Sequence, residues 1–134
     1  MEYSAIFHDM DKRFCYAIDK DVFVIRVQVK KDDMKEIILH YEDKYIPMER
    51  KDTRKTISMK KVATSQFHDY YEAQLQMHLI CLRYFFEFID TDGEKVYYGN
   101  YEFNKDCITN RDRMFDCPQN LREEEMFEVP QWAA

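Results

Sequence analysis

The amino-acid sequence predicts an all-β fold, an immunoglobulin-like antiparallel β-sandwich of about seven to eight strands. Short segments in which apolar and polar residues alternate run through most of the chain, with turn residues between them, as is typical of such sandwiches. Aromatic residues make up 16% of the 134 positions, and tyrosine and phenylalanine favour strands. Glycine occurs only at Gly93 and Gly99, which excludes the glycine-rich phosphate loops of nucleotide-binding folds.

The clearest strand covers residues 21–30, where alternation gives one apolar and one polar face. Its apolar face consists of Phe23, Ile25, Val27 and Val29. Similar patterns predict further strands at residues 14–18, 36–41, 58–63, 69–77, 82–90, 95–98 and 101–103. Asp92 and Gly93 predict a hairpin, because glycine readily adopts a positive φ. Residues 42–56, with Pro47 and many charges, are expected to form a long loop.

The strand pattern fades after Phe103, and this sets the expected domain organisation. The following residues are polar and irregular, and they include Pro118 and Pro130. We therefore expect a β-sandwich domain over residues 1–103 and an irregular connector over residues 104–134.

The net charge of −6 limits the classes of partner. Nucleic acids select basic surfaces, so an acidic chain argues against nucleic-acid binding, and an anionic membrane would not attract it. The start of the chain shows no secretion signal, and no apolar run reaches the ~20 residues of a membrane span. We expect a cytoplasmic protein that makes no membrane contact.

The cysteines and histidines show no metal-binding spacing. They are Cys15, Cys81, Cys107, Cys117, His8, His40, His68 and His78. Without a C-x-x-C pair a zinc site is a poor interpretation, and we expect reduced thiols, although Cys107 and Cys117 would close a loop in an oxidising compartment. The histidines are expected to be structural or at the surface, and no metal or cofactor is expected.

Aromatic side chains are the remaining candidates for binding. Sugars are commonly held by exposed rings that stack on a pyranose, with polar groups that bond its hydroxyls. The tyrosines considered for this role are Tyr41, Tyr45, Tyr70 and Tyr98. Tyr41 and Tyr45 flank the long loop, and Tyr70 lies on the polar face of its strand. The alternative for each tyrosine is that its ring only completes strand packing.

Seven segments form an ordered set over nearly the whole chain. They are residues 6–8, 14–17, 24–27 with Lys30 and Lys31, 41–45, 67–71, 82–86 and 127–132. In order and spacing they resemble the N-terminal domain of the neopullulanase, maltogenic amylase and cyclomaltodextrinase group of the α-amylase superfamily, which is also carbohydrate-binding module family 34. The last segment is similar to the F-x-V-P-x-W junction before the catalytic (β/α)8 barrel. The resemblance weakens at residues 46–56 and 104–122, and Phe85 stands where the family has glycine.

The resemblance implies an accessory domain of a starch-, cyclodextrin- or pullulan-degrading glycosidase. It implies a catalytic barrel elsewhere in the native protein, a homodimeric parent enzyme, and a domain that assists dimerisation and shapes the partner subunit's active site for α-glucans or cyclodextrins. Tyr41, Asp43 and Tyr45 match the family's Y-G-D-P-Y loop, so residues 43–45 are expected to face the partner's groove. No segment resembles the catalytic segments of the barrel, so this chain alone is expected not to be an enzyme.

Two alternatives stay open. The chain could be an independent starch- or maltooligosaccharide-binding module, or a non-carbohydrate interaction β-sandwich. Trp132 is the only tryptophan, whereas family members often carry tryptophans in the region of residues 46–56. This difference favours shaping and pairing over independent starch binding.

Overall fold

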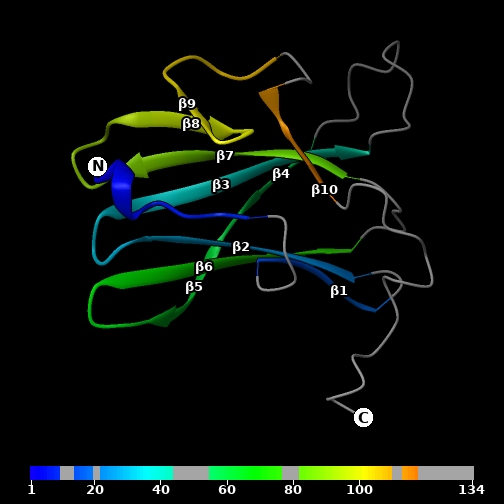
Figure 1. Ribbon diagram of the computed structural model, residues 1–134, viewed down its shortest axis with the longest axis horizontal. Coiled ribbons are helices and arrows are strands. Elements are labelled where there is room, and N and C mark those ends of the chain that lie inside the picture. The colour runs from blue at the N-terminus through cyan, green and yellow to red at the C-terminus, as the bar shows by residue number, and fades with distance from the viewer. Residues whose placement is uncertain (10–13, 20–21, 44–54, 77–81, 110–112, 118–134) are drawn as a thin grey trace.

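The structure, a computed structural model, describes residues 1–9, 14–19, 22–43, 55–76, 82–109 and 113–117. Its strands form two antiparallel sheets that pack face to face (Figure 1). The described residues contain ten strands and one short 3-10 helix, η1 (Tyr3–Ala5). The predicted all-β sandwich is confirmed, with more strands than the seven or eight expected. No helix in these ranges is long and apolar enough to span a membrane.

The first sheet has four strands in the order β1-β2-β6-β5. They are β1 (Cys15–Asp19), β2 (Val22–Lys30), β5 (Lys60–Thr64) and β6 (His68–Gln76). β6 pairs with β2 along its whole length. The alternation in β2 has the expected consequence, because Phe23, Ile25, Val27 and Val29 are all buried in the core between the sheets.

The second sheet has six strands in the order β4-β3-β7-β8-β9, with β10 also paired to β7. They are β3 (Met34–Asp43), β4 (Lys55–Ser58), β7 (Leu82–Asp90), β8 (Lys95–Gly99), β9 (Glu102–Asn104) and β10 (Phe115–Cys117). β8 and β10 share one side of β7: β8 pairs with residues 86–89 and β10 with residues 82–84. β3 covers the other side of β7 over nearly its whole length.

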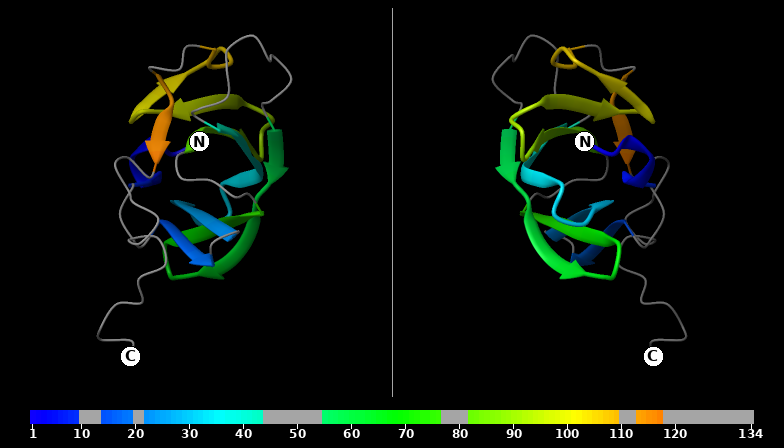
Figure 2. Two further views of the ribbon diagram at one scale, coloured as in Figure 1. Left: turned by 90° about the vertical axis from the view of Figure 1, so that its right-hand side faces the viewer. Right: turned by 90° about the vertical axis from the view of Figure 1, so that its left-hand side faces the viewer.

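The segment predicted as one strand at residues 58–63 is two strands in different sheets. β4 ends at Ser58 and β5 begins at Lys60, so the chain passes from one sheet to the other at Met59. Met59 is buried, and its N–H donates to the carbonyl of Ile37 at 2.8 Å. This crossing closes one side of the sandwich, and the N-terminal segment and β10 lie on the opposite side (Figure 2).

Strand β10 lies beyond the predicted end of the sandwich at residue 103. Phe115 is 1% exposed and its ring lies 5.4 Å from that of Tyr84 and 5.3 Å from that of Tyr98. Part of the predicted connector therefore belongs to the sandwich. The division of the chain into two regions stays a prediction, since residues 118–134 lie outside the described ranges.

A buried histidine joins the two sheets on this side. His8 is 1% exposed; its Nδ1 lies 2.7 Å from the carbonyl oxygen of Arg26 in β2, and its Nε2 lies 2.5 Å from the hydroxyl of Tyr84 in β7. The next residue towards the N-terminus, Phe7, forms a two-way backbone bridge with Gln28. The N-terminal segment is thus fixed to one sheet by its backbone and to both by a side chain, which agrees with the expected structural role of His8.

Two cysteines have environments that spacing did not reveal. Cys15 is buried and takes part in a disulfide, so the expectation of reduced thiols is wrong for this residue. Cys107 is free and exposed, so it closes no loop. Which cysteines meet depends on tertiary contacts between distant segments, and these cannot be read from separation along the chain.

Asp69, at the start of β6, is a buried carboxylate that ties two turns together. It accepts hydrogen bonds from the backbone N–H of Asp32 at 3.0 Å and the hydroxyl of Thr64 at 2.7 Å, and Nζ of Lys61 lies 3.2 Å away. Burial alone would raise the pKa of this carboxyl, but the three donors outweigh burial and lower the pKa of Asp69 below its ordinary value of 3.8. The ionised form therefore stabilises the fold.

We expect Tyr84→Phe to lower the free energy of unfolding by about 1–3 kcal/mol, because it removes the hydroxyl that satisfies the buried Nε2 of His8. Urea unfolding followed by tyrosine and tryptophan fluorescence measures the change. Tyr70→Phe, which removes a hydroxyl from the half-buried outer face of β6, is the matched control. Equal stability of the two variants would contradict a role for the bridge.

We expect Asp69→Asn to weaken the acid sensitivity of the fold. Because the folded pKa of Asp69 is lowered, its stabilisation is present above the ordinary value and is lost as the pH falls through the folded pKa. The variant should be less stable than the parent near neutral pH, and the gap should shrink towards about pH 3. Urea midpoints across this range test the expectation, with exposed Asp92→Asn as control. A gap of constant size would contradict it.

Candidate functional site

The residues predicted from sequence as a site do not gather in one place. Tyr41 lies on the same face of β3 as Ile37 and Leu39, so its ring packs against the core and is half-buried. Burial raises the pKa of its phenol. Tyr41 therefore presents only part of its ring to solvent, and its role in binding stays a prediction. The side chain of Asp43 and the whole of Tyr45 lie outside the described residues.

Tyr98 is also part of the core. It is 6% exposed, its ring stacks on that of Phe103 at 4.4 Å, and burial raises the pKa of its phenol. Its position follows from β8, whose Val96 and Tyr98 both point between the sheets. Tyr98 therefore completes strand packing, which is the alternative role given above for each tyrosine.

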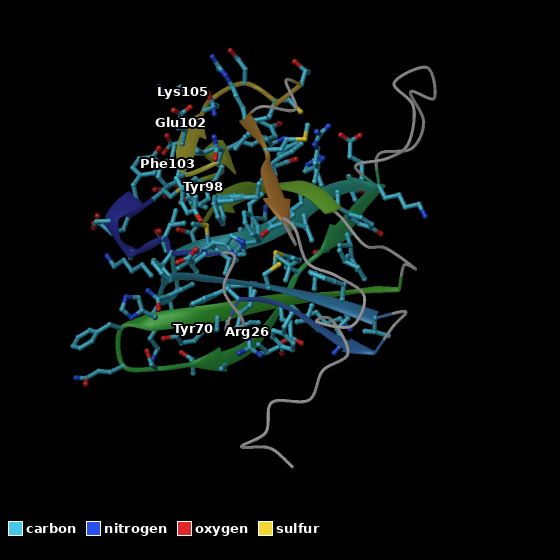
Figure 3. The ribbon with its side chains drawn as sticks, turned by 45° about the vertical axis from the view of Figure 1, so that its right-hand side comes forward. Arg26, Tyr70, Tyr98, Glu102, Phe103 and Lys105 are labelled. Carbon is cyan, nitrogen blue, oxygen red and sulfur yellow. The ribbon has the colours of Figure 1, made fainter. Side chains whose placement is uncertain are left out.

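Tyr70 lies on the outer face of the four-stranded sheet, as its strand pattern predicts. Gln28 is its cross-strand partner, and Arg26 faces Glu72 on the same two strands. Arg26 donates from Nη2 to Oε2 of Glu72 at 2.6 Å and approaches the hydroxyl of Tyr16 at 3.4 Å. Figure 3 shows Arg26 and Tyr70 together on this sheet. We call these five residues the tyrosine face.

The tyrosine face offers flat rings and hydrogen-bonding groups but no arrangement for covalent chemistry. Its carboxylate, Glu72, is held by the guanidinium of Arg26, and that hydrogen bond raises the pKa of Arg26. No group of three histidine, cysteine or acidic side chains in the described ranges is placed to hold a metal ion. The face is therefore suited to contact with a neutral surface or ligand.

The outer face of the six-stranded sheet is partly covered by the chain itself. Phe85, which stands where the resembled family has glycine, is 1% exposed beneath Ile108 and Met114. Its ring stacks on His40 at 4.5 Å, and Nε2 of His40 lies 2.8 Å from Oε1 of Glu87. The large side chain at position 85 thus gives the residues after β9 an apolar surface to pack on.

An aromatic cluster that sequence reasoning missed lies where the β8–β9 hairpin meets the N-terminal segment. Tyr3, Tyr101 and Phe103 are all exposed there, and we call these three residues the aromatic edge. The ring of Tyr3 lies 4.9 Å from that of Phe103. The signal in the sequence is Gly99 followed by Asn100, a turn pair that would place the next aromatic ring at an exposed position. The strand predicted at residues 101–103 did not include this turn.

Comparisons with known proteins agree with this fold. The family model described as "Alpha amylase, N-terminal ig-like domain" matches residues 1–119. The maltogenic α-amylase of Bacillus acidopullulyticus is 30% identical over 128 residues, which are 96% of this chain and 22% of that protein. The intracellular maltogenic amylase of Bacillus subtilis (strain 168) is 27% identical over 135 residues, covering 98% of this chain and 23% of that protein.

Among solved structures, a cyclomaltodextrinase superposes with a TM-score of 0.83 and 29% identity over 98% of this chain. The match again covers only 22% of the other chain. The chain thus spans about a fifth of the length of the relatives it matches. Nearly every residue of the chain takes part in these matches, and the family model covers both sheets, so the chain belongs to the family of α-amylase N-terminal immunoglobulin-like domains.

Proposed function

We propose that this chain is the N-terminal accessory domain of an α-glucan-degrading glycoside hydrolase and that it catalyses no hydrolysis by itself. The observation that carries the proposal is the extent of the match: 96% of this chain corresponds to 22% of a maltogenic α-amylase. The relatives named as cyclomaltodextrinase and maltogenic amylase therefore have most of their length, and room for their chemistry, outside the matched region.

The environments of three buried carboxylates, Asp69, Asp90 and Glu87, support the absence of catalysis. Glycoside hydrolysis uses two carboxyl groups that are free to exchange protons or attack the sugar. Asp69 is held by three donors, Asp90 accepts from the N–H groups of Asp92 and Glu94, and Glu87 lies between His40 and Lys95. Each of these carboxylates therefore has a structural partner and faces no described cavity that would admit a sugar.

The second part of the proposal is that the domain assists dimerisation and shapes the active site of the partner subunit. The support is the resemblance at Tyr41, Asp43 and Tyr45, together with the place of these residues in the fold. β3 is paired with β4 as far as Tyr41 and with β7 as far as Asp43, so both of these residues lie on hydrogen-bonded backbone at the end of the strand.

A cytoplasmic location is proposed as well, supported by the name of the Bacillus subtilis relative, an intracellular maltogenic amylase. The disulfide at Cys15 is unusual for that compartment. Fractionation of producing cells should recover the protein with cytoplasmic markers. Recovery with secreted proteins would contradict this part of the proposal and would agree with the disulfide.

The functional proposal is tested on the full-length enzyme that it implies. We expect removal of residues 1–117 to lower the number of subunits per particle, obtained from the mass measured by light scattering divided by the mass of one subunit, and to change the ratio of cyclodextrin to starch hydrolysis several-fold. The isolated chain should hydrolyse neither substrate. Because a deletion can uncover apolar surface, Tyr45→Ala and Asp43→Lys should change the same ratio in the intact enzyme. An unchanged number of subunits and an unchanged ratio in all three variants would contradict the proposal.

A further inference from the structure

A cavity lies in the segment that follows β9, beside the outer face of the six-stranded sheet. Its volume is about 280 Å³, near the lower end of the range for pockets that hold small molecules. The residues that line it are Asn104, Asp106, Cys107, Ile108, Thr109 and Arg113. Figure 3 shows Lys105 of this segment on the far side of the sandwich from Arg26 and Tyr70, so the cavity is separate from the tyrosine face.

Two residues of the cavity wall are held by packing against the sheet. Ile108 is 3% exposed and packs with Met114 on Phe85. The backbone comes closer still at Gly99 in β8, where an added Cβ would lie 2.2 Å from the carbonyl oxygen of Arg113 and 2.9 Å from Cδ1 of Ile108. Because Ile108 and Arg113 are fixed in this way, the cavity is largely formed before a ligand enters.

One polar group on the cavity wall has no partner. The amide nitrogen of Asn104 is buried and makes no hydrogen bond to any described residue, whereas its amide oxygen lies 3.4 Å from Nη1 of Arg113. A buried donor that lacks an acceptor costs free energy, and such groups are rare in folded proteins. Since Asn104 lines the cavity, an acceptor on a bound molecule would satisfy this donor.

The charged groups of the cavity select the chemistry of the ligand. Arg113 supplies a guanidinium, which is suited to a carboxylate. Asp106 supplies a carboxylate, which would repel a purely anionic ligand and attract an ammonium group. A small molecule that carries both a carboxylate and an ammonium group, as amino acids do, matches both charges.

The same cavity contains a nucleophile. Cys107 is a free and exposed thiol, and it donates to the carbonyl oxygen of Ile108 with a distance of 3.9 Å from the sulfur. An accessible thiol attacks the S–S bond of a small disulfide through its thiolate form. A ligand that enters the cavity as a disulfide can therefore become attached to the protein.

We propose that Cys107 is a site of reversible modification by an amino-acid-type thiol, and that the cavity holds the attached group. The carboxylate of this group meets the guanidinium of Arg113 and the unpartnered amide of Asn104, and its ammonium group meets Asp106. The site is independent of glucan hydrolysis and of pairing between subunits.

The reaction is an exchange between a thiol and a disulfide. The thiolate of Cys107 attacks one sulfur of a small symmetrical disulfide, and a bond forms between Sγ and that sulfur. The S–S bond of the small disulfide breaks, and its other half leaves as a thiolate that takes up a proton. Cys107 is thereby oxidised to a mixed disulfide, and the departing half is reduced to a thiol.

Rates of exchange with three small disulfides test the proposal on the 134-residue chain. Glutathione disulfide carries carboxylate and ammonium groups, cystamine only ammonium groups, and dithiodipropionate only carboxylates. Mass spectrometry of the peptide that contains Cys107 measures each rate, which is divided by the rate of N-acetylcysteine with the same disulfide. The divided rate should be highest for glutathione disulfide, by about fivefold, the factor expected for partly exposed ion pairs.

Charge variants show whether the cavity directs this preference. Arg113→Gln should slow the reaction with glutathione disulfide and with dithiodipropionate about fivefold and should not slow cystamine. Asp106→Asn should slow cystamine and leave dithiodipropionate no slower. Lys105→Gln removes an exposed neighbouring cation that does not line the cavity, so this matched control should react as the parent chain does.

Two kinds of result would overturn the proposal. The first is a chain that forms no mixed disulfide at Cys107, or that gives equal divided rates with the three disulfides. The second is a preference for glutathione disulfide that Arg113→Gln retains, or that Lys105→Gln abolishes as fully as Arg113→Gln does, because general surface charge and not the cavity would then direct the exchange.

Discussion

The bridge through His8 is the contact on which the open side of the sandwich depends. A single buried imidazole meets the backbone of β2 through one nitrogen and the hydroxyl of Tyr84 in β7 through the other. An unsatisfied buried polar group is costly, so the ring is favourable only while both sheets keep their spacing. The rings of Phe14, Phe86 and Phe115 surround it, and these contacts hold the N-terminal segment where β10 and the β8–β9 hairpin can pack beside it.

The position of the N-terminal segment at one margin of the sandwich also explains why the tyrosine face and the aromatic edge differ. The tyrosine face is the solvent side of a sheet whose other side is core, and its charged groups are already paired with one another. The aromatic edge is built at a margin where the sheets do not cover each other, so rings that begin in the core continue outwards to the surface. Exposed rings with buried rings directly behind them are held more firmly than rings on an isolated loop.

Sequence reasoning predicted the elements whose side chains alternate over many residues. β2 and β6 each have one largely buried face, and a period of two is enough to locate such strands and to place Tyr70 on the outer face. β10 was missed because three residues cannot establish a period, and the burial of Phe115 depends on rings more than ten residues away along the chain. The crossing at Met59 was not predicted, because a short polar segment has the same pattern whether it forms one strand or two strands in different sheets.

The candidate site was harder to predict than the fold. The half-buried position of Tyr41 follows from the alternation that also places Ile37 and Leu39 on the core side of β3. The exposure of Tyr101 depends on the left-handed turn and on its bond to Asp9, 92 residues away in sequence. Contacts of this range set which rings are exposed, and no local pattern records them.

The crossing at Met59 gives the sandwich a mechanical asymmetry. On that side β4 of one sheet and β5 of the other are consecutive strands, and only Met59 lies between them. The sheets therefore cannot move apart there without breaking strand pairing. On the other side the N-terminal segment joins them through the contacts of His8, beside the packing of Phe115, and Cys15 of β1 takes part in a disulfide. The two margins of the sandwich therefore differ in kind: at Met59 the chain itself passes between the sheets, whereas at His8 side-chain hydrogen bonds connect them and would be lost together if the sheets moved apart.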